Sequence, residues 1–229
     1  MPTLSLEVLG PVRLSAGPGA AGAPPRRFPL SRLGRRLLVF LLEARIDGED
    51  GMAAATLERR LWPENKRAHA ALQNLVYRLR RQLGSGSVRY VGERYALGAV
   101  ASDAEAFLSG GEVSLWRGGY LEGHDESGRE SVQDRLHQAL RRRVEMLIRR
   151  GDRRAARYAA LLAAVEPYDL AALYLALCSL HVAGQRRQLA QVYRLGRARL
   201  AEVGLHLPDQ ALLIRNLLST GDWASFSFH

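Results

Sequence analysis

The first apolar pattern along the chain has a period of two. In the stretch LSLEVLGPVRL, residues 4–14, apolar and polar residues alternate before Gly10 and Pro11, and apolar Val12 and Leu14 resume the pattern. This alternation is typical of strands with one buried face, and Gly-Pro is typical of a turn, so the stretch predicts strand, turn, strand. The next segment, residues 15–27, is predicted to be a flexible connection because it is rich in Gly, Ala and Pro.

Helical spacing follows in three segments. Ser31 is a predicted N-cap for RLGRRLLVFLLEA, residues 32–44. Its apolar residues form one helical stripe, which comprises Leu33, Leu37, Phe40, Leu41 and Ala44. The stretch ATLERRLW predicts a short second helix that Pro63 ends. A third helix is expected to begin near Lys66 and to include ALQNLVYRLRRQLG, residues 71–84.

The third predicted helix has two different faces. At about 100° per residue, its apolar side chains cluster within about one third of the circumference, and these are Leu72, Leu75, Val76, Leu79 and Leu83. The opposite side carries Gln73, Asn74, Tyr77, Arg78 and Arg81. The apolar stripe is expected to enter a core. The polar face is left for solvent, for a membrane surface or for DNA.

A predicted hairpin completes the N-terminal half. The stretch VRYVGERYAL, residues 88–97, contains two short alternating runs around Gly92-Glu93, which predicts a tight type II′ turn. Strands, three helices and a hairpin are the element order of a winged helix. In that fold the third helix enters the major groove, and the hairpin reaches the backbone or the minor groove beside it.

Beyond residue 100 the pattern is helical and repeats. Aligning Gly151 with Gly184 superposes apolar positions 33 residues apart, such as Val144 on Leu177. A period of about 34 residues with two helices per unit is typical of tetratricopeptide repeats. Both glycines fall where a first helix is expected to end, and Pro167 follows the second helix of the first unit. Residues 208–218 predict a capping helix, whereas the tail that follows them supports no interpretation.

The charge of the chain is positive and unevenly distributed. There are 33 Lys+Arg against 23 Asp+Glu, and every basic residue of these except Lys66 is arginine. Residues 1–100 contain 16 basic and 8 acidic side chains, which points to a polyanionic partner for this half. An arginine-rich protein with a merely solvated basic face is the alternative.

Several other functions are not indicated. Cys178 is the only cysteine and lies in an apolar run, so a buried, inert thiol is expected. There is no signal-peptide pattern and no apolar run near 18 residues, so we expect a cytoplasmic protein without membrane contact. No catalytic or phosphate-binding motif is present, and EGHDES, residues 122–127, is interpreted as a solvated loop. Neither an enzyme nor a bound metal or cofactor is expected.

The polar face of the third helix contains candidates for reading bases and for holding phosphates. Asn74 can pair with adenine, Arg78 can pair with guanine, and Tyr77 can contact a thymine methyl group or a phosphate. Candidates for the DNA backbone are the neighbouring residues Lys66, Arg67, His69, Arg80 and Arg81.

In the hairpin, Arg89 and Arg94 are candidates for phosphate or minor-groove contact. The alternatives left open for these two are pairing with Glu93 or exposure to water.

The motifs together resemble a known family. LERRLWPE, ALQNLVYRLRRQLG and VRYVGERYAL resemble the OmpR/PhoB-type winged helix of SARP-family transcriptional activators. DAEAF, LWRGGYL and the stretch from Glu166 to Asp209 resemble the bacterial transcriptional activator domain of that family. The resemblance runs from Leu4 to Leu218, and it implies binding to direct repeats upstream of promoters and recruitment of RNA polymerase.

The resemblance also assigns residues. It implies groove-facing roles for Asn74, Tyr77 and Arg78 and a backbone contact for Arg80. The chain departs from the family pattern at Arg94, where a glycine usually precedes the tyrosine of the wing.

The sequence therefore predicts a mainly α protein with two domains. Residues 1–100 are expected to form the winged-helix DNA-binding domain, and residues 101–229 are expected to form a tetratricopeptide-like activator domain. The expected function is sequence-specific binding of double-stranded DNA and activation through RNA polymerase holoenzyme, as a homodimer or as molecules bound in tandem. The alternative is a protein-interaction adaptor that binds nucleic acid without sequence preference.

Overall fold

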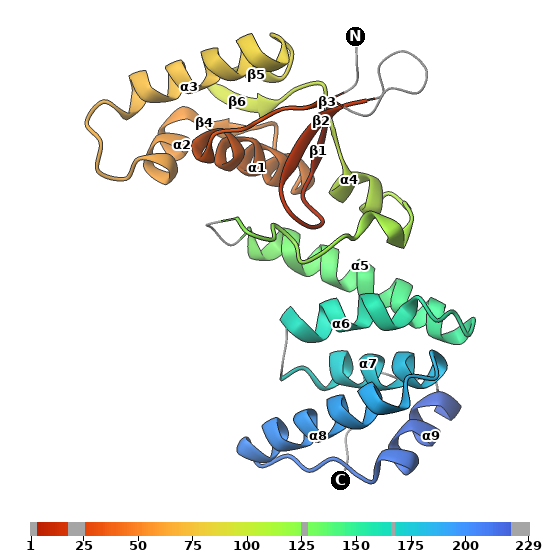
Figure 1. Cartoon of the computed structure of the whole chain (residues 1–229). Helices are drawn as coiled ribbons and strands as arrows, with labels where there is room; N and C mark the ends of the chain where they lie inside the picture. Colours follow the sequence, from red (N-terminus) through yellow and green to blue (C-terminus); the bar gives the residue numbers. More distant parts are fainter. Residues whose placement is uncertain (1–3, 18–25, 125–127, 166–167, 221–229) are drawn as a thin grey trace. The chain divides into compact units, whose positions relative to one another are not determined.

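The chain is mainly helical with a small β component, as predicted. The computed structural model describes residues 4–17, 26–124, 128–165 and 168–220. These residues belong to two compact units, Met1–Leu136 and His137–His229. The first unit combines sheets and helices, and the described part of the second unit consists of helices joined by turns (Figure 1).

A four-stranded sheet begins the first unit. β1 (Leu4–Glu7) and β2 (Arg13–Ala16) pair antiparallel, which confirms the predicted strand, turn, strand. β3 (Arg26–Arg27) pairs with β2, and β7 (Val100–Ser102) runs parallel to β1, so the order is β3-β2-β1-β7. β3 and β7 were not predicted, because two or three residues are too few to show a period. Of the predicted flexible connection, residues 18–25 lie outside the described residues, and its ends belong to β2 and β3.

Helix α1 (Arg32–Ile46) is the central helix of the first unit. Ser31 is its N-cap, as predicted, because the Ser31 hydroxyl accepts a hydrogen bond from the Gly34 amide at 3.1 Å. Leu37, Phe40, Leu41 and Ala44 of the predicted stripe are buried, whereas Leu33 is only half-buried. The intervening residues 38, 39 and 42 are buried as well. The helix is therefore enclosed on more sides than a single stripe requires.

Two more helices and a second sheet complete the expected order. They are β4 (Met52–Ala53), α2 (Ala54–Leu61), α3 (Ala68–Leu83), β5 (Val88–Val91) and β6 (Arg94–Leu97). The sheet order is β4-β6-β5, and β4 was not predicted. α2 ends before Pro63, as expected, and α3 begins two residues after Lys66. Figure 1 shows the β5-β6 hairpin beside α3.

The first compact unit extends beyond the boundary predicted at residue 100. α4 (Asp103–Leu108) and the 3-10 turn η1 (Val113–Leu115) follow β7 directly. The Asp103 carboxylate is buried and accepts hydrogen bonds from the amides of Val8 and Leu9 at 2.8 and 3.1 Å. Arg117 donates to the same carboxylate at 2.7 Å. These bonds hold the segment after residue 100 against β1, so the compact unit ends at Leu136.

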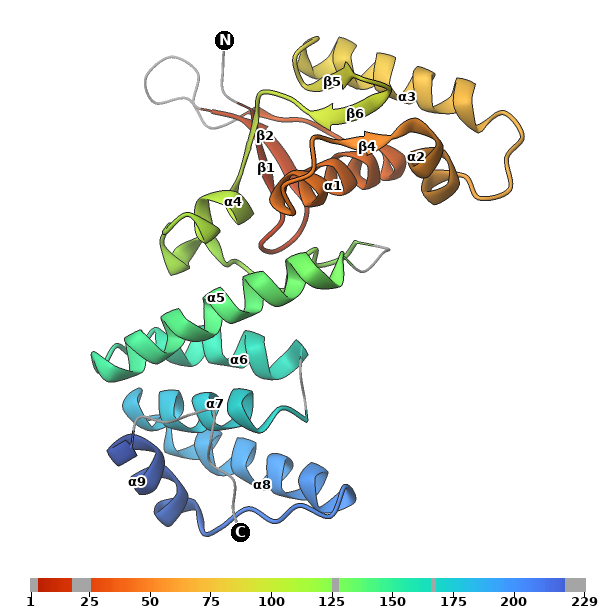
Figure 2. The same ribbon diagram turned by 180° about the vertical axis from the view of Figure 1, so that it is seen from behind.

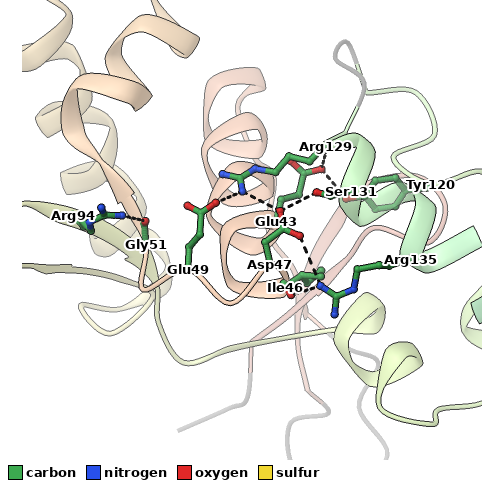
Figure 3. A network of polar contacts seen from close by, with 10 residues as sticks. All are labelled: Glu43, Ile46, Asp47, Glu49, Gly51, Arg94, Tyr120, Arg129, Ser131 and Arg135. Atoms are coloured by element: carbon green, nitrogen blue, oxygen red, sulfur yellow. Dashed lines mark hydrogen bonds and ion pairs between the residues drawn. The ribbon is translucent and has the colours of Figure 1, made fainter.

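A buried carboxylate fixes the start of helix α5 (Glu130–Arg149) to α1. Oε1 of Glu43, which is 1% exposed, accepts hydrogen bonds from the Tyr120 hydroxyl at 2.9 Å and from the Arg129 amide at 2.8 Å (Figure 3). Burial raises the pKa of the Glu43 carboxyl, and the two hydrogen bonds oppose this shift. Burial and the neighbouring Glu43 also raise the pKa of Tyr120.

Ion pairs surround this buried group. The Arg129 guanidinium pairs with Asp47 at 3.1 Å and also with Glu49. Ser131 donates to Asp47 at 3.0 Å, and Arg135 donates to the carbonyl oxygen of residue 46 at 2.8 Å (Figure 3). The first turns of α5 therefore belong to the first unit.

The described part of the second unit consists of consecutive helices (Figure 2). After α5 come α6 (Ala155–Val165), α7 (Leu170–Val182), α8 (Arg186–Glu202) and α9 (Gln210–Thr220). Of these, α7 contacts α6, α8 and α9. Gly151 and Gly184, 33 residues apart, follow the ends of α5 and α7 with φ angles of 67° and 71°. They therefore lie at the two positions where the sequence predicts that a helix ends. α9 forms at the position of the predicted capping helix.

Residues that align 33 positions apart are buried to the same degree at some positions and not at others. Val144 and Leu177 are both fully buried, as their alignment predicts. Leu162 is 4% exposed, whereas Leu195, aligned with it, is 52% exposed. Cys178 is buried, and burial raises the pKa of its thiol to about 12, as expected for an inert cysteine. Pro167 and the tail from residue 221 lie outside the described residues.

Candidate nucleic-acid interface

Helix α3 is anchored by the apolar stripe that the sequence predicts. Leu72, Leu75, Val76 and Leu79 are at most 3% exposed, and Leu83 at the last turn is half-buried. Burial of each such side chain contributes about 1.5–3 kcal/mol. The helix is thus fixed in rotation, and its opposite face points away from the core.

That opposite face is exposed along its length. Asn74, Tyr77, Arg78 and Arg81 are all exposed, and Tyr77 is 63% exposed. An aromatic ring with this exposure is accessible to a binding partner. The structure therefore brings the three predicted base-reading side chains, Asn74, Tyr77 and Arg78, onto one accessible surface.

A shallow hollow lies within this surface. Besides the three side chains on α3, it is lined by Ala71, by Leu33 at the start of α1 and by Trp62 after α2. Leu33 and Trp62 were not among the predicted site residues. Leu33 was placed in the core because it shares the stripe of α1, and only the packing of three helices brings it beside Tyr77.

The residues before α3 are exposed, but His69 is already engaged. Lys66 and Arg67 precede the helix, and the Arg67 amide donates to the Asn65 side chain at 2.8 Å. Nδ1 of His69 lies 2.8 Å from Oε1 of Glu58, and Nε2 of His69 lies 3.0 Å from the side-chain nitrogen Nε2 of Gln73. His69 thus joins α2 to α3.

Arg80 differs from the arginines on either side of it. Its Nε donates to the carbonyl oxygen of Val88 at 2.9 Å, and the side chain is half-buried. One of its five N–H groups therefore holds strand β5 against α3. The sequence predicts Arg80 as a contact of the DNA backbone but does not show this bond.

The hairpin has a turn of a different type from the one predicted. Gly92 and Glu93 both have positive φ angles, 54° and 63°, and Val91 faces Arg94 across a two-residue loop. Positive φ at both central residues defines type I′, so the prediction of type II′ was wrong. Type I′ matches the right-handed twist of the two strands.

The β5-β6 hairpin is tied to β4 through Arg94. Arg94 donates to the carbonyl oxygen of Gly51 at 3.0 Å (Figure 3). The rings of Tyr90 and Tyr95 lie 4.7 Å apart. Arg89 is exposed, as are Tyr90 and Val91, which are 50% and 66% exposed and were not among the predicted site residues.

A metal site and a membrane span find no support among the described residues. Within them, no group of three or more His, Cys, Asp or Glu side chains is placed to hold a metal ion. Of the EGHDES stretch, residues 125–127 lie outside the described part. No helix within the described ranges is long and apolar enough to cross a membrane.

Comparison with known proteins supports the fold. No model of a known protein family and no curated protein matches the chain. Among solved structures, it is similar to Mycobacterium tuberculosis EmbR in complex with a low affinity phosphopeptide, with a TM-score of 0.64 and 18% identity. The match covers 96% of this chain and 66% of that chain. At this identity the likeness concerns the fold, and it supports the SARP-like fold that the sequence resemblance implies.

Proposed function

We propose that the chain is a sequence-specific regulator of transcription that binds double-stranded DNA through α3. The observation that carries this proposal is the pair of faces on α3, one buried and the other exposing Asn74, Tyr77 and Arg78 together. An amide, an aromatic ring and a guanidinium on one helix are suited to base edges in the major groove. The SARP-like fold of the EmbR neighbour supports a regulator of this type.

Each side chain then has a distinct role. Arg78 makes a bidentate contact with guanine, Asn74 pairs with adenine, and Tyr77 contacts a thymine methyl group. Phosphate contacts position the helix and come from Lys66, Arg67, Arg81 and the remaining N–H groups of Arg80. His69 joins them by exchanging its contact with Gln73 for one with a phosphate. The exposed Arg89, together with Arg94, contacts the backbone or the minor groove from the hairpin.

The mode of action follows from the family resemblance. We propose that tetratricopeptide-like helix pairs form the second unit and that the protein activates transcription by recruiting RNA polymerase holoenzyme. Binding to direct repeats places two molecules in tandem, or as a homodimer, on one duplex. Native mass spectrometry of the complex with a two-repeat duplex should give two chains per duplex, and one chain per duplex would contradict this arrangement.

A second function, from a different class, is a protein-interaction adaptor with non-specific affinity for nucleic acid. The observation that favours it is the charge of residues 137–229, which contain 14 arginines and 7 acidic residues. Positive charge of this kind attracts any polyanion regardless of sequence.

The two functions predict different binding to genomic DNA fragments when random DNA competes for the protein. Labelled genomic fragments are incubated with the protein in excess random DNA at physiological salt, and bound fragments are separated by gel shift. A regulator retains a few discrete fragments that share a repeated motif. Retention of none, or of all fragments equally, would favour the adaptor.

A further inference from the structure

A groove lies within the second unit, on the helices α6, α7 and α8. It has a volume of about 640 Å³, with α7 between the other two helices. Its lining is largely apolar and includes Ala156 and Ala160 of α6, Leu173 and Leu180 of α7, and Val192 and Leu195 of α8. All of these residues belong to the second unit, so the groove depends on that unit alone.

The groove has the dimensions of a short helix. The lining residues of α7 run from Leu173 to Leu180, and those of α8 run from Gln188 to Arg199. These spans are about two and about three helical turns, or roughly 10 and 17 Å. The alanines of α6 leave room on that side because their side chains are short. Two to three turns of another helix would cover the exposed apolar lining.

Leu195 marks an apolar position that lacks a cover. Its repeat equivalent, Leu162, is 4% exposed, whereas Leu195 is 52% exposed in the wall of the groove. Covering such a side chain with another apolar group contributes about 25 cal/mol per Å² of buried apolar surface. Leu195 therefore occupies a position that is buried at its repeat equivalent, but no described residue covers it to the same degree.

The charge of the groove is positive. Arg153, Arg157 and Arg199 line it, and all three are exposed. The single acidic residue among the described lining residues is Asp169, whose carboxylate pairs with Arg141 and caps α7 through the Ala171 amide at 2.8 Å. Because that carboxylate is already compensated, the cations of the groove favour an anionic occupant.

We propose that this groove binds an acidic amphipathic helix of a protein partner. The leucines of such a helix would fill the apolar floor, and its carboxylates would meet Arg153 and Arg199. A strand is a poorer occupant, because the elements described in this unit are helices and offer no sheet edge to extend. This binding site goes beyond the proposed function and does not depend on DNA binding by α3.

The test uses the full chain and a displayed library of amphipathic helices with a fixed leucine stripe and random polar positions. Selection against the wild-type chain should enrich Asp and Glu at the random positions. An enriched peptide should then bind Arg199→Glu about three- to tenfold more weakly, because reversal turns attraction into repulsion. Leu195→Ala should weaken binding about fivefold through lost apolar contact.

Arg197→Glu is the matched control, since it changes the same charge two residues away on the same helix and is also exposed but lies outside the groove lining. It should weaken binding less than twofold, because residues two apart on a helix do not share a face and no contact within the groove is changed. Circular dichroism and thermal unfolding establish that all three variants are folded.

Three results would overturn the proposal. The first is a selection without acidic enrichment, and the second is an equal effect of Arg197→Glu and Arg199→Glu. The third is a different occupant: random duplex DNA that displaces the peptide and binds Arg199→Glu more weakly, or a dimer in gel filtration that Arg199→Glu dissociates. DNA binding by α3 is measured separately on the same variants, so failure of the groove leaves the proposed function intact.

Discussion

At the residue scale, neighbouring arginines of α3 have different environments. Arg78 and Arg81 are exposed, whereas Arg80 is half-buried and donates to the Val88 carbonyl oxygen. Composition alone treats the three as equal contributors to positive charge. Their environments distinguish Arg78, the proposed base contact, and Arg81, the proposed phosphate contact, from Arg80, which also holds the β5-β6 hairpin against α3.

Arg80→Ala and Arg81→Ala should therefore behave differently. Arg81→Ala should weaken binding to all duplexes and reduce the salt slope by about 1, without a change in the free energy of unfolding. Arg80→Ala should reduce binding similarly and also lower the free energy of unfolding by about 1 kcal/mol, because a hydrogen bond is lost. Urea unfolding and salt titrations of DNA binding measure both quantities. Equal stability of the two variants would contradict the structural role of Arg80.

Tyr77 provides a test that leaves the protein unchanged. If its exposed ring contacts a thymine methyl group, replacing one thymine of the bound site by deoxyuridine removes only that methyl. Affinity for the wild-type protein should fall about three- to fivefold, the effect of one buried methyl group. Tyr77→Ala should show no difference between the two duplexes. A wild-type protein that is indifferent to every such replacement would exclude the methyl contact.

At the element scale, the long helices of the first unit were predicted and the shortest strands were not. α1 and α3 contain about four turns each, so their apolar stripes show a clear period. β3, β4 and β7 contain two or three residues and form only because a partner strand is present. The prediction of a type II′ turn was wrong because the sequence Gly92-Glu93 is compatible with more than one backbone geometry.

The site was predictable to a similar degree. The exposed face of α3 follows from helical periodicity, so Asn74, Tyr77 and Arg78 were placed together correctly. Leu33 and Trp62 were missed because they come from other helices, and the Arg80 bond was missed because it depends on how the hairpin packs. Contacts between elements distant in sequence are set by tertiary structure and leave no local period.

Gly51 in front of β4 is required by the packing of the hairpin. Its φ is +136°, and an added Cβ would lie 2.5 Å from the carbonyl oxygen of Tyr95. Gly51→Ala should lower the free energy of unfolding by well over about 1 kcal/mol. Gly48→Ala is the matched control, because Gly48 also has positive φ (+81°) but open space around it. Urea unfolding of both variants compares the two costs, and an equal loss would show that the clash is relieved.

The buried Glu43 carboxyl, which accepts hydrogen bonds from Tyr120 and from the Arg129 amide, should make the stability of the protein depend on pH. Its pKa is raised above the ordinary 4.5, so the folded protein binds this proton more tightly than the unfolded chain does. The resulting stabilisation is present below about pH 4.5 and is lost as pH rises through the folded pKa. Glu43→Gln retains an oxygen acceptor and does not titrate.

The free energy of unfolding of Glu43→Gln minus that of the wild type should therefore increase with pH across this window and then level off. Urea unfolding at a series of pH values measures the difference, and the exposed Glu64→Gln gives the baseline. A difference that is constant, or that decreases with pH, would show that burial of Glu43 does not control this titration.

At the scale of the whole molecule, the distribution of charge depends on where the chain divides. Division at residue 100 concentrates the positive charge in the N-terminal part. Residues 101–136, however, contain 8 acidic and 3 basic side chains, and they belong to the first compact unit. The excess of arginine is then larger in residues 137–229, which agrees with a separate anionic partner for the second unit.

The central claim is that the exposed face of α3 reads bases. It is tested most directly by selecting bound duplexes from a random library with the wild type, Arg78→Ala and Arg81→Ala, and sequencing them. The wild type should yield one motif, Arg78→Ala should lose the preference for guanine at one position at a cost of about 1–3 kcal/mol, and Arg81→Ala should keep the whole motif. No motif for the wild type, or an unchanged motif for Arg78→Ala, would contradict the claim.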